Sequence, residues 1–326
     1  MNIYRITLYA ASTRNLGVDS QSTIMGRTDV VLSSLVSDSQ KWIIGELENG
    51  QEIRSLNNPY YKLNVGPSYN ADVYTSNADT SMDFVPAGAN GVYYIRSSSN
   101  PSKYLTASNR SDGASISWQA LANSDLQKWK FTEMSIGASG TVYASASGSL
   151  TTSRQTANAG YIYDFLMARG FTAQAACGIL GNIMQECTMN PGAWQFSNNL
   201  EYGYGLVQWS PGRKFINWAK EVGVISAATV TRINDLASNN AKALMNAQLF
   251  YLLECIGNSS DFMNPAYADY TNHTGYVMNI AQYKSSTLRP EILALVFNDH
   301  YERSGDKDDE LGNRGDYASD WYSELA

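Results

Sequence analysis

Histidine is scarce in this chain of 326 residues, which has only His273 and His300. A zinc hydrolase needs two or three histidines with carboxylate or cysteine ligands at suitable spacing, and no His-Glu-x-x-His motif is present. A cysteine peptidase or amidase would need a cysteine beside one of these histidines, and neither has a recognisable nucleophile context. A phosphate-binding glycine loop is also missing. We therefore expect no metal site and no cofactor.

Cysteine is equally scarce, with Cys177, Cys187 and Cys255. Three is an odd number and too few for a disulfide framework. If Cys177 and Cys187 lie on one helix, their separation is about 15 Å, which is too far to bridge. We predict reduced, buried thiols.

Long apolar runs are absent as well. Without a run of 18 apolar residues, we expect no insertion into a membrane. The N-terminal segment 1–11 is typical of a strand and lacks the charged start and apolar core of a signal peptide. Export would then need another route, such as lysis of the cell.

Charged residues are few, at 16%, and the net charge of −7 is uneven. Residues 1–134 contain 11 basic and 12 acidic side chains, whereas residues 135–326 contain 12 and 18. An acidic second half argues against nucleic acid as a partner, because phosphate binding needs clustered Lys and Arg. Recognition is left to aromatic and polar contacts, for which 22 Tyr and 7 Trp are available. Nothing in the sequence indicates an oligomeric state.

The length favours two domains. Residues 135–157 are small and polar, which is typical of a flexible Ser/Gly/Ala linker. The segment before it, 1–134, is rich in β-branched and aromatic residues separated by turn formers. The segment after it, 158–326, has helical periodicity.

The first half of the chain contains an internal repeat. The segment Ile53–Leu63 returns as Ile95–Leu105, an offset of 42, and Gln40-Lys-Trp42 returns as Gln127-Lys-Trp129, an offset of 87. Met82-Asp-Phe84 lies midway as a degenerate copy. The spacing predicts three units of about 42 residues with pseudo-threefold symmetry.

These repeats resemble the ricin-type lectin domain, an all-β β-trefoil in which each repeat carries a Gln-x-Trp signature. The resemblance covers residues 3–134, and two of the three signatures are intact. We expect Trp42, Phe84 and Trp129 to form the hydrophobic layer of the barrel.

The lectin resemblance also implies a sugar pocket with a stacking aromatic about ten residues before each signature. Aligning the repeats assigns this position to Leu32, Thr75 and Trp118, so only the third keeps an aromatic ring. Carbohydrate binding is therefore predicted at Trp118, with Asn109 and Gln127 in support. Alternatively, the trefoil binds a non-carbohydrate wall component or a protein, or is a structural spacer.

Beyond residue 158 the apolar spacing predicts two consecutive helices. The first ends at Gly170, and the second starts after Thr172, a good N-cap, and ends before Pro191. Its apolar stripe comprises Ala176, Ile179, Leu180, Ile183 and Met184. Further helices are predicted over 244–256 and 292–297.

Glu186 borders this apolar stripe near the end of the second helix. The negative end of the helix dipole and partial burial both disfavour its ionised form. A carboxyl group that stays protonated near neutral pH is what a general acid needs. Equally, a backbone group or an Arg could simply hold Glu186.

The motif Gly178–Pro191, followed by Gly205-Leu-Val-Gln-Trp209, resembles the phage tail-tip lysozyme family. Members have a mainly α lysozyme-like fold with a short β-hairpin and cleave peptidoglycan. The resemblance covers residues 158–305, with Cys187 where the family usually has Ser. The family pattern falls on Asn182, Glu186, Gln208, Trp209 and Arg213.

The resemblance implies that Glu186 is the catalytic acid. Glu201, at the entrance to the hairpin, is a candidate base or electrostatic stabiliser, or else a solvated loop residue. If Glu201 is idle, a lytic transglycosylase mechanism with Glu186 alone remains open. We expect Gln208, Trp209, Tyr204 and Arg213 to bind substrate, with core packing as the alternative for Trp209 and Tyr204.

Two groups of acidic residues near the C-terminus are expected to be structural, with no part in catalysis. Glu302 is expected to pair with an Arg, and the run Asp306–Glu310 is expected to form a solvated loop.

Together these features predict a modular peptidoglycan hydrolase that cuts the β-1,4 bond between N-acetylmuramic acid and N-acetylglucosamine. Its partner would be bacterial peptidoglycan or cell-wall glycan. A phage endolysin, a tail-associated lysin and a bacterial autolysin are the candidate settings. The alternative from another class is a wall-binding protein with an inactive lysozyme-like half.

Overall fold

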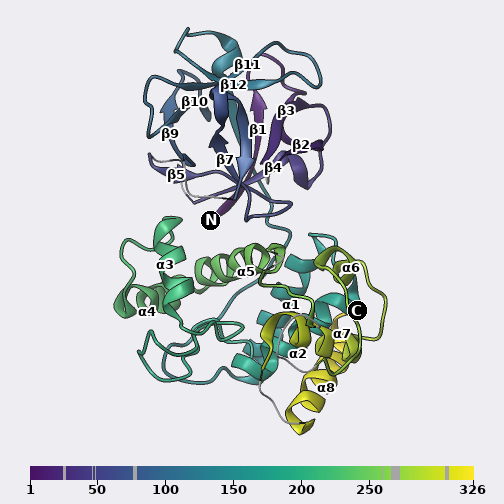
Figure 1. Ribbon diagram of the computed structural model, residues 1–326. Helices are drawn as coiled ribbons and strands as arrows, with labels where there is room; N and C mark the ends of the chain where they lie inside the picture. The colour runs from purple at the N-terminus through teal and green to yellow at the C-terminus, as the bar shows by residue number, and fades with distance from the viewer. Residues whose placement is uncertain are drawn as a thin grey trace. The chain divides into compact units, whose positions relative to one another are not determined.

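A computed structural model of the protein divides after Ser135 into two units, Met1–Ser135 and Ile136–Ala326 (Figure 1). The structure describes residues 1–24, 27–45, 47, 49–75, 79–258, 260–265, 272–304 and 308–326. Each unit is considered by itself. Within the described ranges, no helix has the length and apolar character needed to cross a membrane.

The N-terminal unit is all-β and forms a β-trefoil. A ring of paired strands runs β6-β4-β1-β13-β10-β9-β5. The ring is closed by the chain itself, because β5 and β6 are consecutive and only the buried Ile53 separates them. Three hairpins, β2–β3, β7–β8 and β11–β12, complete the three repeats. The strands are β1 (Asn2–Leu8), β2 (Asn15–Ile24), β3 (Arg27–Ser33), β4 (Lys41–Ile44), β5 (Gln51–Glu52), β6 (Arg54–Ser55), β7 (Lys62–Val65), β8 (Ala71–Tyr74), β9 (Ser81–Pro86), β10 (Val92–Ser97), β11 (Tyr104–Ala107), β12 (Ile116–Gln119) and β13 (Lys128–Met134).

The predicted aromatic layer is confirmed. Trp42, Phe84 and Trp129 are all buried in one hydrophobic core. The two intact signatures are held alike, since Trp42 Nε1 donates to the Leu16 carbonyl (2.9 Å) and Trp129 Nε1 to the Leu105 carbonyl (3.0 Å). Conversion of the second signature to Met82-Asp-Phe84 removes this hydrogen bond and keeps the apolar packing.

The C-terminal unit is mainly helical (Figure 1). The helices predicted over 244–256 and 292–297 are confirmed, and so is the Thr172 N-cap, whose hydroxyl accepts from the Ala175 amide. The elements are α1 (Thr152–Met167), α2 (Ala173–Cys187), α3 (Arg213–Glu221), α4 (Val230–Asn239), α5 (Ala241–Gly257), α6 (Ile280–Lys284), α7 (Pro290–Phe297), the π-helix η5 (Asn298–Glu302) and α8 (Asp308–Leu325).

Helix α2 lies against α7 and α8, and two glycines allow this close approach. A Cβ atom on Gly178 would lie 2.9 Å from the Leu293 carbonyl carbon, and one on Gly181 would overlap the Arg314 carbonyl oxygen. Larger residues at either position would push the neighbouring helix away. The glycines therefore bring α8 within reach of the polar end of α2.

The prediction of a flexible linker over 135–157 is wrong. Residues 152–157 belong to α1, and the segment before α1 is part of the C-terminal unit, with Ala138, Val142 and Leu150 buried. Although this segment has little apolar surface, two asparagines from the helical unit, Asn158 and Asn190, bond to its backbone.

Each asparagine side-chain amide bonds to both backbone groups of one residue, as a neighbouring strand would. The Asn158 side chain accepts from the Tyr143 amide (2.9 Å) and donates to the Tyr143 carbonyl (2.7 Å). The Asn190 side chain makes the same pair of bonds with Ser145, at 2.9 and 2.8 Å. Because composition alone does not reveal such partners, the segment had the signature of a spacer.

The predicted acidic loop is only partly described. Residues 305–307 lie outside the described ranges, and α8 already begins at Asp308. The loop prediction is therefore wrong for Asp308–Glu310.

Candidate active site

Glu186 lies in the last turn of α2. The helix ends at Cys187, and Thr188 follows in the left-handed conformation (φ 50°), so the chain turns away immediately after the carboxyl group. The Glu186 side chain is 20% exposed, and Arg314 Nη2 of α8 donates to its Oε1 at 2.6 Å. The Arg partner left open by the sequence is therefore present. Its positive charge favours the ionised form of Glu186, against the helix end and burial.

Arg314 is itself fixed by Asn182, one turn before Glu186 on α2. Arg314 Nη1 donates to Asn182 Oδ1 (3.0 Å), and Asn182 Nδ2 donates to the carbonyls of Gly178 and Ala294 (2.9 Å each). Asn182 is fully buried, and Arg314 is 1% exposed. The buried network thus links α2, α7 and α8 and fixes the orientation of the Glu186 carboxyl group.

A groove of about 580 Å³ lies in front of Glu186. We call it the Glu186 groove; its lining comprises Glu186, Ala193, Trp194, Gln195, Gln208, Ser210 and Ser304. The predicted pair Glu186 and Gln208 is therefore brought together. The Gln208 amide nitrogen already donates to the carbonyls of Gly205 (2.9 Å) and Ala193 (3.3 Å), so this side chain also holds the groove wall together.

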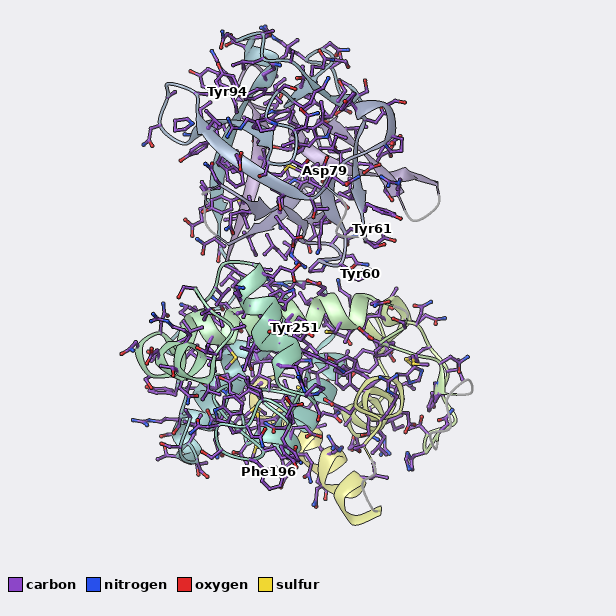
Figure 2. The ribbon with its side chains drawn as sticks, turned by 60° about the vertical axis from the view of Figure 1, so that its left-hand side comes forward. Tyr60, Tyr61, Asp79, Tyr94, Phe196 and Tyr251 are labelled. Carbon is purple, nitrogen blue, oxygen red and sulfur yellow. The ribbon has the colours of Figure 1, made fainter. Side chains whose placement is uncertain are left out.

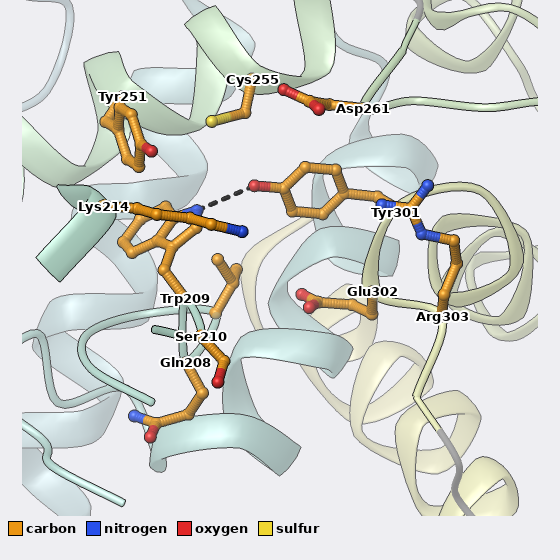
Figure 3. A pocket seen from close by; sticks show the side chains of 11 residues that line it. Gln208, Trp209, Ser210, Lys214, Tyr251, Cys255, Asp261, Tyr301, Glu302 and Arg303 are labelled. Atoms are coloured by element: carbon orange, nitrogen blue, oxygen red, sulfur yellow. Dashed lines mark hydrogen bonds between the residues drawn. The ribbon is translucent and has the colours of Figure 1, made fainter. Parts of the chain in front are cut away.

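Trp209 lies in an adjoining hollow of about 360 Å³, which we call the Trp209 hollow (Figure 3). Its indole nitrogen donates to the Tyr301 hydroxyl (2.9 Å), and its ring stacks on Phe215 with a centroid distance of 5.4 Å. Trp209 is only 7% exposed, so it is chiefly a core residue with one edge in the hollow. Gln208 and Ser210 line both this hollow and the Glu186 groove.

Charged residues also line the Trp209 hollow. Figure 3 shows the amino group of Lys214 and the carboxyl group of Glu302 pointing into the same space. Burial raises the pKa of Asp261, which Arg303 and Lys214 oppose through their positive charges. The predicted role of Glu302, pairing with an Arg, stays a prediction.

Three of the predicted site residues lie elsewhere. Glu201 and Arg213 are both exposed and form an ion pair with each other, and neither is among the described residues that line the Glu186 groove. Tyr204 is fully buried between Trp194 and Phe215, so the prediction that it contacts substrate is wrong. The glycine-rich hairpin is compact, with a single bridge pairing Tyr204 to Trp209, and it turns the Tyr204 ring inwards.

The predicted sugar pocket of the N-terminal unit is wrong in its central residue. Trp118 is 1% exposed and its indole nitrogen donates to the Asn64 carbonyl (3.1 Å). Gln127 is buried and bonds to Thr106 and Ala120, whereas Asn109 lies in an exposed turn, where it accepts from the Ser111 amide.

Strand register explains this error. Leu16 pairs with Leu32, Leu63 with Val73 and Leu105 with Trp118. Trp118 is therefore the third-repeat equivalent of Leu32 and Val73, a position that faces the core in every repeat. The next residue in each repeat lies on the opposite face of its strand. Those residues are Ser33, Tyr74 and Gln119.

A different hollow, of about 230 Å³, is present between the first two repeats, and we call it the Tyr61 hollow. Tyr61 packs edge-on against Tyr60 with a centroid distance of 6.3 Å (Figure 2). Around the Tyr61 ring lie hydroxyl, amide and carboxyl groups. The lining comprises Val18, Asp19, Thr28, Ser39, Ser55, Asn57, Asn58, Tyr61 and Val73.

Residues 157–325 match the profile of the phage tail lysozyme family. The chain belongs to the phage tail lysozyme family. Over 186 residues it is 31% identical to Morphogenesis protein 1 of Bacillus phage B103, an alignment that covers 56% of this chain and 43% of that protein. The chain thus spans less than half the length of this curated relative.

The N-terminal unit of the chain is similar to solved trefoil structures. The designed threefold-symmetric protein ThreeFoil is 24% identical over 40% of this chain and 99% of its own, with a TM-score of 0.35. The C-half of the earthworm R-type lectin, solved with GalNAc, is 12% identical over 41% of this chain and all of its own, with a TM-score of 0.33.

The sequence interpretation missed two residues of the candidate site, Trp194 and Arg314. Trp194 follows Pro191 by only three residues, and an aromatic residue so soon after the helix that carries Glu186 was a usable signal. Arg314 lies on a helix whose apolar spacing, Leu311, Ala318 and Trp321, is visible in the sequence. Its pairing with Glu186 depends on the contact between α2 and α8, which the sequence does not reveal.

Proposed function

We propose that this protein is a modular peptidoglycan hydrolase that cuts the β-1,4 bond between N-acetylmuramic acid and N-acetylglucosamine. Glu186 acts as the general acid and protonates the leaving glycosidic oxygen. The observation that carries this proposal is the Glu186 groove, in which a carboxyl group of fixed orientation lies beside Trp194 and Gln208. Membership of the phage tail lysozyme family supports it.

The second carboxylate separates two mechanisms. Glu201 is exposed and paired with Arg213, and the described lining of the Glu186 groove contains Glu186 as its one carboxyl group. This favours the second candidate, a lytic transglycosylase in which the 6-hydroxyl of the sugar displaces the leaving group. For a hydrolase, Asp261 and Glu302 of the adjoining Trp209 hollow are better placed to act as a base than Glu201.

The trefoil unit is proposed to hold the enzyme on the cell wall by binding carbohydrate. Its candidate contact is the Tyr61 hollow, where an aromatic ring lies among hydroxyl and amide groups suited to a sugar. This ligand site replaces the one predicted around Trp118.

The biological setting is proposed as that of a phage lysin. An endolysin and a virion-associated lysin both fit, and the name of the relative from Bacillus phage B103 supports the virion-associated setting. A bacterial autolysin remains the third setting, and a wall-binding protein without activity is the alternative from another class.

Digestion of purified peptidoglycan, with products analysed by mass spectrometry before and after borohydride reduction, tests this function. Reducible muramic-acid ends would support the muramidase, and ends lacking one water would support the transglycosylase. Reducible glucosamine ends would mean that the other glycan bond is cut. Intact strands with freed peptides would overturn the glycosidase proposal, and no products from several walls would favour the binding protein.

A further inference from the structure

A third hollow, of about 360 Å³, adjoins the Glu186 groove. It shares Ala193 and Trp194 with the groove, just as the Trp209 hollow shares Gln208 and Ser210 with it. The Glu186 groove is therefore a neighbour of both other hollows. We call the third space the serine hollow.

The serine hollow has an unusual wall. One side is formed by residues 145–149, Ser-Ala-Ser-Gly-Ser, which belong to the segment that resembles a spacer. The other side comes from the end of α2 and the following loop, including Thr188 and Ser197. Residues 145–149 precede the region that matches the phage tail lysozyme family, which begins at residue 157.

The wall is held in place before any ligand arrives. Asn190, 3% exposed, bonds to both backbone groups of Ser145 and also donates to the Gly148 carbonyl at 3.2 Å. Gly192 allows the close approach, since a Cβ atom there would lie 2.8 Å from the Ser145 carbonyl oxygen. A binding surface whose backbone is already fixed loses little conformational entropy when it binds.

The chemistry of the lining favours an uncharged polyol. No charged side chain is among the described residues that line the serine hollow, whereas hydroxyl groups come from Ser147, Ser149 and Ser197. An anionic peptide or phosphate would need cationic partners here. Neutral sugar hydroxyls and N-acetyl groups can exchange hydrogen bonds with serine hydroxyls and backbone groups.

Trp194 supplies a flat apolar surface at the junction with the Glu186 groove. Its indole nitrogen donates to Asn234 Oδ1 (2.9 Å), and its ring packs against Tyr204 with a centroid distance of 4.3 Å, which fixes its orientation. The ring is only half-buried and lines both spaces. A pyranose ring that stacks on Trp194 would therefore lie next to Glu186.

We propose that the serine hollow is an outlying saccharide subsite next to the Glu186 groove, beyond the two sugars that flank the cleaved bond, and that residues 145–149 are part of the active-site cleft. This inference rests on the proposed function and names the part of the glycan strand recognised there, an uncharged N-acetylated sugar beyond those that flank the cut. Strands long enough to occupy the hollow bind more tightly than short ones.

The test compares Ser147→Trp, which fills the hollow from an exposed position, with the matched control Ser153→Trp in the exposed first turn of α1. Both variants are made in the full chain, and unchanged thermal unfolding establishes that they fold. Peptide-free peptidoglycan glycan strands, separated by length, serve as substrate. We expect Ser147→Trp to raise KM for long strands about tenfold, equal to about 1.4 kcal/mol, with kcat and the cleavage of the shortest substrates unchanged. Equal behaviour of both variants at every length would overturn the subsite.

A binding measurement separates this inference from the proposed function. In a Glu186→Gln background, isothermal titration with the same strands reports affinity without cleavage. Weaker binding when Ser147→Trp is added supports the subsite even if the wild type cuts no glycan, a result that would reject only the proposed function. Unchanged affinity beside normal wild-type cleavage rejects the subsite and leaves the proposed function intact. The variant Trp194→Ala should weaken binding in the same assay, and failure to do so would also count against the subsite.

Discussion

The ion pair between Glu186 and Arg314 determines how the proposed acid is presented to substrate. Arg314 holds Oε1 and is itself held by Asn182, so the carboxyl group has little freedom to rotate. The guanidinium also favours the ionised form, against the helix end and burial. A general acid has to be protonated when substrate binds, so the balance between these effects sets the upper pH limit of activity.

Replacing Arg314 with Met tests this balance. Loss of the cation makes protonation of Glu186 easier, so the fall in activity at alkaline pH should move to higher pH, while kcat drops because the carboxyl group is less well oriented. Breaking a buried pair should also lower the free energy of unfolding by about 3–5 kcal/mol. The matched variant Arg213→Met breaks the exposed pair with Glu201 and should cost no more than about 1 kcal/mol. An unchanged pH–activity profile for Arg314→Met would contradict the account.

The three thiols should be almost inert in the folded protein. Burial raises the pKa of Cys177 and of Cys255 to about 12, and it raises that of Cys187 as well. Only the thiolate attacks a disulfide reagent, so at pH 8 native protein should react slowly with Ellman's reagent, and all three thiols should react quickly in denaturant. Rapid release of one equivalent from native protein would show an accessible thiol and refute this expectation.

At the scale of elements, strand β12 illustrates how register assigns neighbouring residues to opposite faces. Trp118 lies in the core and Gln119 outside. We expect Trp118→Ala to lower the free energy of unfolding of the N-terminal unit by about 3–5 kcal/mol, and Gln119→Ala to change it by no more than about 0.5 kcal/mol. Urea unfolding of both variants measures this. A Trp118→Ala protein of normal stability that no longer binds wall glycan would restore the stacking role predicted from the sequence.

Those elements that follow from local patterns could be predicted. Helix α2 was readable because its apolar stripe and the Thr172 cap are both local signals, and the placement of Glu186 at its end followed. The trefoil repeat was readable because its signatures recur at fixed offsets. The alignment of repeats did not fix strand register, however. A shift of one residue along a strand exchanges its inner and outer faces, so the alignment assigned Trp118 to the surface although it lies in the core.

The remaining parts of the site depend on long-range contacts. The hydrogen bonds of Asn190 to Ser145 join residues 45 positions apart. The ion pair of Arg314 with Glu186 joins residues 128 positions apart. Neither the serine-rich segment 145–149 nor Arg314 carries a local signal of its partner. The composition of the segment even indicates the opposite, because small polar residues are also the signature of flexible chain.

At the scale of the whole molecule, the boundary after Ser135 makes a prediction about fragments. Residues 136–326 should fold alone and retain full activity on short soluble substrates. Residues 158–326 should fail to fold, because they lack the start of α1 and the preceding segment that is bonded to Asn158 and Asn190. Circular dichroism and activity of the two fragments check this. A folded, fully active 158–326 fragment would restore the linker interpretation.

The proposed division of labour makes the N-terminal unit responsible for attachment. Deleting residues 1–135 should therefore weaken pelleting of the protein with intact cell walls and leave cleavage of small fragments unchanged. The variant Tyr61→Ala in the full chain should reproduce part of this loss. If the C-terminal unit alone both binds and digests whole walls as well as the full chain does, wall targeting by the trefoil is refuted.

The most direct test of the central claim compares Glu186→Gln with Glu201→Gln on purified peptidoglycan, measured as the rate of glycan-strand cleavage. The two carboxyl groups each pair with an arginine, but only Glu186 lines the groove. We predict that Glu186→Gln still folds, with a lowered free energy of unfolding because the buried Arg314 loses its carboxylate partner. Its rate of cleavage should fall by about 100- to 10,000-fold, whereas that of Glu201→Gln should stay close to wild type. Near-normal cleavage by a folded Glu186→Gln protein would contradict the assignment of the general acid.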